Sequence, residues 1–312
     1  MDFFAGSGTT GQSVIDANRK DQGNRGYLLI EAESYFHNVL KPRVIKSAYC
    51  KIWEQGKPSS SSVRDTAASH SFKYIFLESY EDTLGNLALN RPSGQQSLLD
   101  ASDESPLKQA RQAYVMNYML EVESRGSASL LNTAQFLDPT RYQLNVRSAG
   151  GDETKAVNVD LLETFNYLLG LRVEHIAAPL HFDAEFSQGE YGRLQAKVNR
   201  SPEGKWWFRT VYGKNANGQS VLVVWRNLPS VIAGGDDGMQ RDNAVLDAVL
   251  IEKLKIRLTE SADDEIDILY VNGDHNIAIP RDRKGQAMEQ ARLQLIEETF
   301  HRLMFAGSES VQ

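Results

Sequence analysis

Residues 2–11 read DFFAGSGTTG, and this glycine-rich stretch decides how the first part of the chain folds. Gly6, Gly8 and Gly11 have the G-x-G-x-x-G spacing, which lets the backbone turn sharply and approach a ligand closely. Apolar residues at helical spacing follow over residues 12–18, so the turn would lie at a helix N-terminus that points N–H groups at the ligand. The pattern predicts a strand end, a turn and a helix in that order.

A second short strand is predicted at residues 27–30, an apolar run (YLLI) between a glycine and an acid. That acid, Glu31, lies 20 residues after the last glycine of the turn, the distance at which a carboxylate accepts hydrogen bonds from ribose hydroxyls. A helix capped by Ser34 is expected next, with Pro42 kinking or restarting it. Residues 1–57 therefore form a predicted α/β unit that binds a nucleoside-containing cofactor.

Two cofactor classes suit this arrangement. A nicotinamide dinucleotide needs its pyrophosphate at the helix N-terminus, whereas S-adenosylmethionine has no phosphate and lays its amino-acid part and sulfonium over the loop. Asp2 stands at the strand end, where a dinucleotide site usually has an apolar residue. Phe3 and Phe4 add aromatic surface for an adenosine or methionine moiety, while Thr9 and Thr10 offer hydroxyls to a carboxylate or amine. These residues favour S-adenosylmethionine, and a nicotinamide-dependent oxidoreductase is an alternative.

The stretch at residues 2–10 resembles the cofactor motif of amino-DNA methyltransferases, most closely the beta class, whose members methylate exocyclic amines of adenine or cytosine. In this resemblance Phe4, Gly6 and Gly8 form an F-x-G-x-G core, and Glu31 is the ribose-binding acid. The wider chain is similar to the C-terminal part of the modification subunit of type III restriction–modification systems. The segments that carry this similarity are residues 72–82, 160–176 (DLLETFNYLLGLRVEHI), 221–228 (VLVVWRNL), 266–276 (IDILYVNGDHN) and 297–305 (EETFHRLMF).

The resemblance implies a cytoplasmic, site-specific DNA adenine-N6 methyltransferase that binds S-adenosylmethionine. It implies DNA, a second modification subunit and the restriction subunit as partners, and no membrane. The implied fold class is α/β, with a partial Rossmann-like methyltransferase unit followed by an α+β C-terminal domain. The resemblance implies no catalytic residue and no metal ligand in this chain, and the implied cofactor-binding residues are Asp2, Phe3, Phe4, Gly6, Ser7, Gly8, Thr9, Thr10 and Glu31.

The catalytic motif of that family, a polar residue followed by Pro-Pro and an aromatic residue, is not found in the sequence. The nearest string, Asp138-Pro139-Thr140-Arg141-Tyr142, is interpreted as a loop. In the beta class this motif and the target recognition domain precede the cofactor motif. We therefore expect both upstream of this chain and little or no methylation by the chain alone. The sheet would keep an open apolar edge, which implies a partner chain, an upstream half or reduced local stability. The alternative is a non-catalytic DNA- or subunit-binding assembly module that keeps a remnant of the fold.

Three further regions are predicted after residue 57. They are a Ser-rich linker or loop (58–71), a mixed and mainly helical region (72–190) and a small α/β C-terminal domain (191–312). Asp160 fits a helix N-cap and Gly170 fits the position after that helix. Expected strands are 72–77, 194–198, 206–212, 220–225 and 266–271, and expected helices are 81–89, 107–123, 160–169, 243–258 and 286–305, with a loop at 91–106.

Composition sets broader limits. The chain has 312 residues and a net charge of −7, and it contains no uninterrupted apolar stretch of about 18 residues that would span a membrane. Its single cysteine, Cys50, excludes an internal disulfide and favours a cytoplasmic setting. Residues 1–75 hold ten Lys and Arg against seven Asp and Glu, so this part is locally basic. The cluster Lys41, Arg43, Lys46, Lys51 and Lys57 is either a solvated helix face or a phosphate-contacting surface.

Other groups of residues favour structural roles. His175 and His181 lack the spacing of metal ligands on one helix, and Asp236, Asp237 and Asp242 lack the Glu-x-Lys of a metal-dependent nuclease. The aromatic run at residues 206–208 is predicted to form core, with stacking on bases as the alternative. The final helix is predicted to pack within its own domain, with a partner interface as the alternative.

Overall fold

A computed structural model describes residues 1–33, 35–59, 67–87, 131–147, 153–189, 192–253, 266–277 and 293–305. The chain divides into two compact units, named here the N-terminal unit (Met1–Ser79 with Arg147–Lys155) and the sheet unit (Tyr80–Val146 with Ala156–Gln312). Several predicted features lie outside the described residues: the Ser34 cap, the loop at 91–106, the helix at 107–123, and residues 60–66, 254–258 and 286–292 of longer predicted segments.

Two short segments pair in parallel in the N-terminal unit. Asp2 forms a parallel bridge with Leu29. The Asp2 N–H donates to the Leu28 carbonyl and the Ile30 N–H donates to the Asp2 carbonyl, both over 2.9 Å. The Ala5 N–H donates to the Ile30 carbonyl over 3.1 Å, and the chain then leaves the pair at the glycine turn. The two predicted strands are thus neighbours, although their pairing is only one bridge long.

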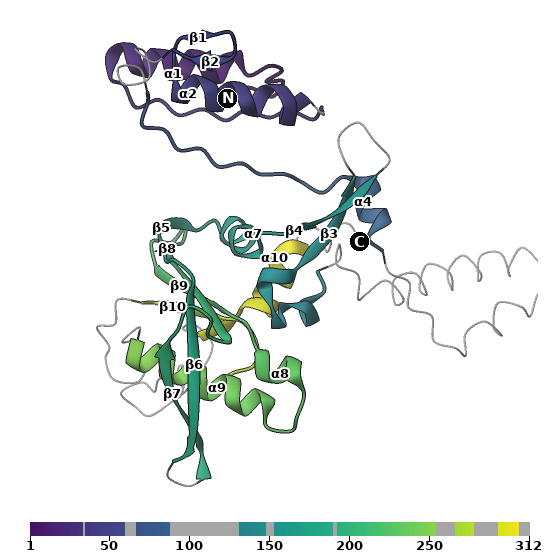
Figure 1. Cartoon of the computed structure of the whole chain (residues 1–312), viewed down its shortest axis with the longest axis vertical. Helices are drawn as coiled ribbons and strands as arrows, with labels where there is room; N and C mark the ends of the chain where they lie inside the picture. Colours follow the sequence, from purple (N-terminus) through teal and green to yellow (C-terminus); the bar gives the residue numbers. More distant parts are fainter. Residues whose placement is uncertain are drawn as a thin grey trace, which may run out of the picture. The chain divides into compact units, whose positions relative to one another are not determined.

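Two helices pack on each other beside this pair (Figure 1). Helix α1 (Thr9–Asp21) is longer at both ends than the predicted helix. A π-helical turn, η1 (Phe36–Leu40), runs directly into α2 (Lys41–Tyr49), and Pro42 lies in the first turn of α2. Of the two predicted roles of Pro42, kinking or restarting the helix, the structure shows the second. Among the described residues of this unit, Ala5, Ile15, Leu40 and Val44 form one small buried apolar cluster.

A hairpin and an extended segment complete the described N-terminal unit. Strands β1 (Trp53–Glu54) and β2 (Lys57–Pro58) are joined by a tight turn with positive φ at both of its central residues. Residues 67–79 contain neither helix nor strand, so the predicted strand at 72–77 is wrong. The alternating aromatic residues that suggested a strand instead contact rings of η1 and of the segment before it.

The sheet unit contains a seven-stranded mixed sheet among the described residues. Its order is β11-β10-β9-β8-β6-β7, and β5 pairs with the other part of β8. Strand β10 is parallel to both β9 and β11, and the remaining pairs are antiparallel. The strand bounds are β5 (Arg172–Ile176), β6 (Leu180–Gln188), β7 (Leu194–Arg200), β8 (Trp206–Lys214), β9 (Ser220–Arg226), β10 (Ile268–Val271) and β11 (Leu293–Leu295).

Strands β7 to β10 confirm four predicted strands, and the turn at Gly218, with φ of 79°, joins β8 to β9 as predicted. Strands β5 and β6 were not predicted. The β6–β7 pair spans the predicted domain boundary between residues 190 and 191. Residues 293–295 form β11 and not helix, because they pair in parallel with β10 before α10 (Ile296–Phe305) begins.

The helices of the sheet unit follow their capping signals. Helix α7 (Leu161–Leu168) begins at Asp160, whose side chain accepts from the Glu163 N–H over 3.0 Å, and ends before Gly170, with φ of 60°. Both predictions are confirmed. The remaining elements are α4 (Tyr80–Gly85), η3 (Thr133–Leu137), η4 (Pro139–Arg141), β3 (Gln143–Arg147) paired with β4 (Thr154–Asn158), α8 (Pro229–Ala233), α9 (Gly238–Ala248) and η6 (Val249–Lys253).

The central strands β9 and β10 are buried on both faces, and β9 shows this most clearly. Val223 and Trp225 belong to one core cluster with residues of α7 and α10, whereas Leu222 and Val224 belong to another with residues of α9. A strand covered on both sides is apolar at nearly every position, as this one is. The chain is therefore a mixed α/β protein, and none of its described helices is long and apolar enough to cross a membrane.

Candidate functional site

The glycine turn connects the first paired segment to α1. Gly6 has φ of 54° and Gly8 has φ of 82°, and residues other than glycine rarely adopt such left-handed backbone conformations. A Cβ on Gly8 would also lie 3.3 Å from Leu40 Cγ, and one on Gly11 would lie 2.9 Å from Leu29 Cδ1. Gly6 is thus required by its positive φ, and Gly11 is required because α1 packs closely on the paired segment. Gly8 is required both by its positive φ and by its close packing on Leu40.

Glu31 lies against this turn, as the sequence spacing predicts. Its Oε2 accepts from the Gly6 N–H over 2.8 Å, and its Oε1 accepts from the Glu33 N–H over 3.1 Å. These two N–H groups, Glu33 first, lower the pKa of the Glu31 carboxyl below its usual range. The side chain therefore stays ionised at neutral pH, and the Tyr35 hydroxyl also hydrogen-bonds to it.

Asp2 provides a second carboxylate on the turn. Its Oδ2 accepts from the Thr10 hydroxyl over 2.6 Å, and its Oδ1 accepts from the Phe4 N–H over 3.2 Å. Thr10 lies in the first turn of α1, so the carboxylate is held at the positive end of the helix dipole. Gly8 is the N-cap residue of α1 and has no side chain with which to cap the helix.

Of the other predicted cofactor residues, Phe4 joins this network through its N–H, which donates to Asp2, and Phe3, Ser7, Gly8 and Thr9 border the turn. Phe3 and Phe4 are 58% and 90% exposed, so their rings are available for contact with a ligand. Ser7 is half-buried in the turn, and Thr9 is the first residue of α1. Hydrogen bonds join Asp2 to Thr10 and Glu31 to Gly6, and the backbone hydrogen bonds between the two paired segments bring these two pairs together. The remaining predicted residues around them are Phe3, Phe4, Ser7, Gly8 and Thr9.

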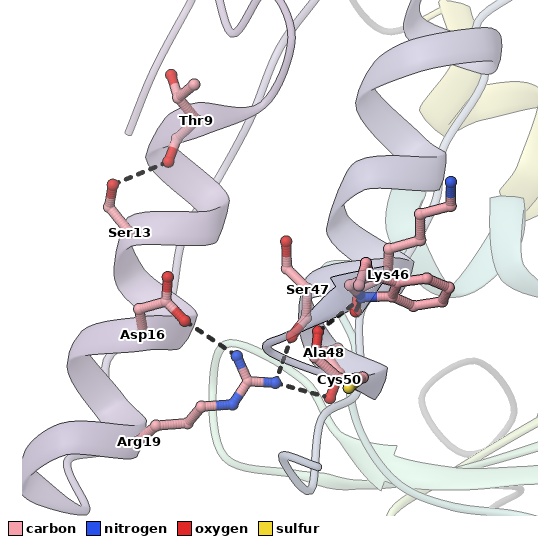
Figure 2. A network of polar contacts seen from close by, with 9 residues as sticks. Thr9, Ser13, Asp16, Arg19, Lys46, Ser47, Ala48 and Cys50 are labelled. Carbon is pink, nitrogen blue, oxygen red and sulfur yellow. Dashed lines mark hydrogen bonds and ion pairs between the residues drawn. The ribbon is translucent and has the colours of Figure 1, made fainter. Parts of the chain in front are cut away.

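Sequence reasoning missed the contact that fixes α1 against α2 (Figure 2). Arg19 on α1 pairs with Asp16 over 3.0 Å and donates to the carbonyls of Ser47 and Ala48 at the end of α2, the latter over 3.1 Å. A cation is favourable there because the last carbonyls of a helix have no helical partner. The Asp16–Arg19 spacing was a visible signal, but the acceptors lie 28 and 29 residues away in sequence.

The alternative metal sites gain no geometric support. No group of three His, Cys, Asp or Glu side chains within the described ranges is arranged to hold a metal ion. Asp242 is buried and accepts from the Trp206 indole over 2.8 Å, so it supports the packing of α9 on β8. Residues 206–208 are buried, which confirms their predicted core role. The predicted loop at Asp138 is a capped 3-10 turn.

The sheet unit holds a buried arginine that the sequence did not reveal. Arg226 is fully buried at the end of β9 and donates to the carbonyls of Asn272, Asp242 and Asp274 and to the Asn243 side chain over 2.7 to 3.1 Å. Burial lowers the pKa of its guanidinium to about 10, so it is still charged at neutral pH. It ties β9 to α9 and to the segment after β10, which is a structural role.

The glycine turn with its two carboxylates is the candidate site that the described residues define best. It combines a helix N-terminus, backbone that only glycine adopts readily, and two acids within hydrogen-bond distance of the turn. No protein-family model, no curated protein and no solved structure matches this chain.

Proposed function

We propose that the glycine turn binds S-adenosylmethionine, and that the chain is the C-terminal portion of a site-specific DNA adenine-N6 methyltransferase. The observation that carries the cofactor assignment is the pair of carboxylates, Asp2 and Glu31, bonded to the two sides of the turn. S-adenosylmethionine has a cationic sulfonium and a cationic amine, which two nearby carboxylates attract. A pyrophosphate would be repelled by the same charges, so a nicotinamide dinucleotide fits less well.

The site has unused capacity for such a ligand. A carboxylate offers about four acceptor positions, and Glu31 uses two of them on backbone N–H groups and a third on the Tyr35 hydroxyl, which leaves about one for a ribose hydroxyl. Asp2 likewise retains acceptor positions for the methionine amine, directly or through water. The exposed rings of Phe3 and Phe4 would cover the adenosine or methionine moiety, and Ser7, Thr9 and Thr10 would offer hydroxyls or amides.

The bound cofactor supplies the methyl group, and this chain's contribution is to hold and orient it. Gly6 and Gly8 permit close backbone approach, while Arg19 keeps α1 fixed against α2. The wider assignment rests on the resemblance of the sequence segments. It includes a Rossmann-like unit in a cytoplasmic type III modification subunit, with DNA, a second modification subunit and a restriction subunit as partners. A flipped adenine would be presented by residues outside this chain.

Titration calorimetry of the chain with S-adenosylmethionine tests the cofactor proposal. We expect one site per chain, with Glu31→Gln weakening affinity by roughly 10- to 100-fold because hydrogen bonds to a charged group are lost. Gly8→Arg should abolish binding, since it forces a side chain onto strained backbone beside Leu40. Gly26→Ala is the matched control, because a Cβ there meets no atom within 4 Å. Tight binding of a nicotinamide dinucleotide without binding of S-adenosylmethionine would overturn the proposal.

A non-catalytic assembly module is the second candidate, and one observation favours it. Phe3, Leu28 and Ile30 are large apolar side chains on or beside the paired segments, and each is 42% exposed or more. Exposed apolar surface next to an open edge is suited to another chain. Absence of cofactor binding at millimolar ligand, together with a stable complex between two copies or with DNA, would favour this module.

A further inference from the structure

The extended segment at residues 67–79 carries aromatic side chains at alternate positions. His70, Phe72, Tyr74 and Phe76 are two residues apart, so in extended backbone they lie on one face. That face is turned toward the rest of the N-terminal unit. His70 stacks on Tyr27 at 5.6 Å between ring centroids, and its Nε2 lies 2.6 Å from the Tyr27 hydroxyl oxygen. Further along, Tyr74 stacks on Phe36 at 5.5 Å.

A cavity of about 1420 Å³ lies between this segment, α1, η1 and α2. Phe72 and Tyr74 line it and are still 42% and 38% exposed, although their face is turned inward. The cavity is therefore open to a ligand that can contact ring faces. It lies in one unit only, and it includes the last turn of α1, whereas the glycine turn lies at the first turn.

The charge of the lining is strongly asymmetric. Lys41 Nζ lies 4.0 Å from the centroid of the Tyr74 ring, so a cation and an aromatic face occur together. Arg19 pairs with Asp16 and Arg25 pairs with Asp21, so part of the positive charge of the lining is compensated. Among the described residues that line the cavity, Asp16 is the only acidic one, and the basic ones are Arg19, Lys20, Arg25, Lys41, Lys51 and Lys73.

We propose that this cavity binds single-stranded nucleic acid, with a base against the exposed ring of Phe72 and phosphates near the lysines. Aromatic faces beside a basic groove are the combination that holds unpaired strands, because every base has a π-face and every phosphate a charge. A duplex keeps its bases stacked inside and cannot use the rings. An acidic peptide would use the lysines but not the rings. The inference goes beyond methyl transfer and does not require the cofactor site.

Fluorescence anisotropy of a labelled single-stranded oligothymidylate of about 12 nucleotides tests the proposal on the full chain. Phe72→Ala should weaken binding by roughly 5- to 100-fold, the loss expected for one base–aromatic stack. Leu77→Ala is the matched control, because Leu77 belongs to the same segment, is 78% exposed and does not line the cavity. Lys20→Gln should lower the slope of log affinity against log salt by about 0.7 if Lys20 neutralises one phosphate.

Competition identifies the ligand. Duplex DNA of the same length, AMP and polyglutamate should each compete far less well than the unlabelled single strand. Equal competition by polyglutamate or by duplex would overturn the proposal, as would binding of AMP without binding of the oligonucleotide. Unchanged affinity in Phe72→Ala protein, with the fold verified by circular dichroism, would also overturn it. A parallel S-adenosylmethionine titration on the same sample shows whether the cofactor proposal stands independently.

Discussion

The two units of the chain differ in where their apolar residues lie. In the sheet unit, β9 is buried on both faces and large residues such as Trp225 and Phe165 are fully enclosed. In the described part of the N-terminal unit the buried apolar cluster has four residues, while Phe4, Leu28 and Tyr74 are partly or largely exposed. Regions that bind ligands are commonly drawn from the less stable parts of a protein. The sheet unit thus has the larger buried core, and both sites that we propose lie in the unit with the smaller one.

The largest expected effect is in the sheet core. Trp225→Ala removes a fully buried ring that contacts Phe136 and Phe165 at 5.8 and 6.0 Å between centroids. We expect the free energy of unfolding of the sheet unit to fall by about 3–5 kcal/mol. Urea unfolding followed by hydrogen exchange of individual peptides measures each unit separately. Tyr167→Ala, a 68% exposed aromatic on α7, is the control and should change little. An equal loss in both variants would contradict the proposed core.

A smaller and more local effect is expected in the N-terminal unit. Ile15 is 1% exposed and packs with Leu40 and Val44, so Ile15→Ala should cost about 2–3 kcal/mol, the low end for such a deletion, because a small open core can relax. Trp53 is the tryptophan of this unit, and its fluorescence during urea unfolding reports the change. Ile45→Ala, at a 44% exposed position on α2, is the control. Equal destabilisation of the sheet unit would show that the two units are one cooperative body.

The sequence predicted best where local chemistry decides the structure. Asp160 and Gly170 mark the ends of α7 because a side-chain acceptor and a left-handed residue act locally. The spacing of Glu31 from the turn was also sufficient to place it. Arg19 and Arg226 could not be located in this way, because their acceptors come from distant parts of the chain.

The residue pattern was also ambiguous where a strand and an extended loop have the same alternation of side chains. The alternation from His70 to Phe76 is typical of a half-buried strand, but its rings find partners in η1 and in Tyr27 without a neighbouring strand. The reverse error occurred at Leu293–Leu295, where helical spacing predicted a helix and parallel pairing with β10 made a strand. In both places tertiary contacts decided between conformations that local periodicity allows.

A third prediction compares how helices begin in the two units. Asp160 caps α7 through its side chain, whereas α1 begins at Gly8 with no side-chain cap. Asp160→Ala should therefore cost the sheet unit about 1 kcal/mol, and Asp160→Ser should restore most of it. The shift of the urea unfolding midpoint measures the effect of each substitution, provided that the slope of unfolding free energy against urea concentration is unchanged. A full loss in the Ser variant would show that the cap is not the source of the effect.

The smallest expected effect is an opposite pH dependence of the two units. In the N-terminal unit, hydrogen bonding from Arg25 lowers the pKa of Asp21 to about 2. In the sheet unit, burial raises the pKa of Glu297 and of Asp247. A lowered carboxyl pKa contributes stability above its unfolded value, and that contribution is lost as pH falls toward the folded value. A raised pKa contributes stability below the unfolded value, and that contribution is lost as pH rises through the folded value.

Acidification from neutral pH to about 4 should therefore favour the sheet unit through Glu297 and Asp247 while leaving the contribution of Asp21 in place. Further acidification toward pH 2 should remove the contribution of Asp21 from the N-terminal unit. Urea unfolding of Trp53→Phe protein at a series of pH values isolates the sheet unit, since its fluorescence then comes from Trp206, Trp207 and Trp225. Glu297→Gln should flatten that profile, and Asp21→Asn should leave it unchanged because Asp21 belongs to the other unit. A profile that Glu297→Gln does not alter would mean that another group controls the acid response of the sheet.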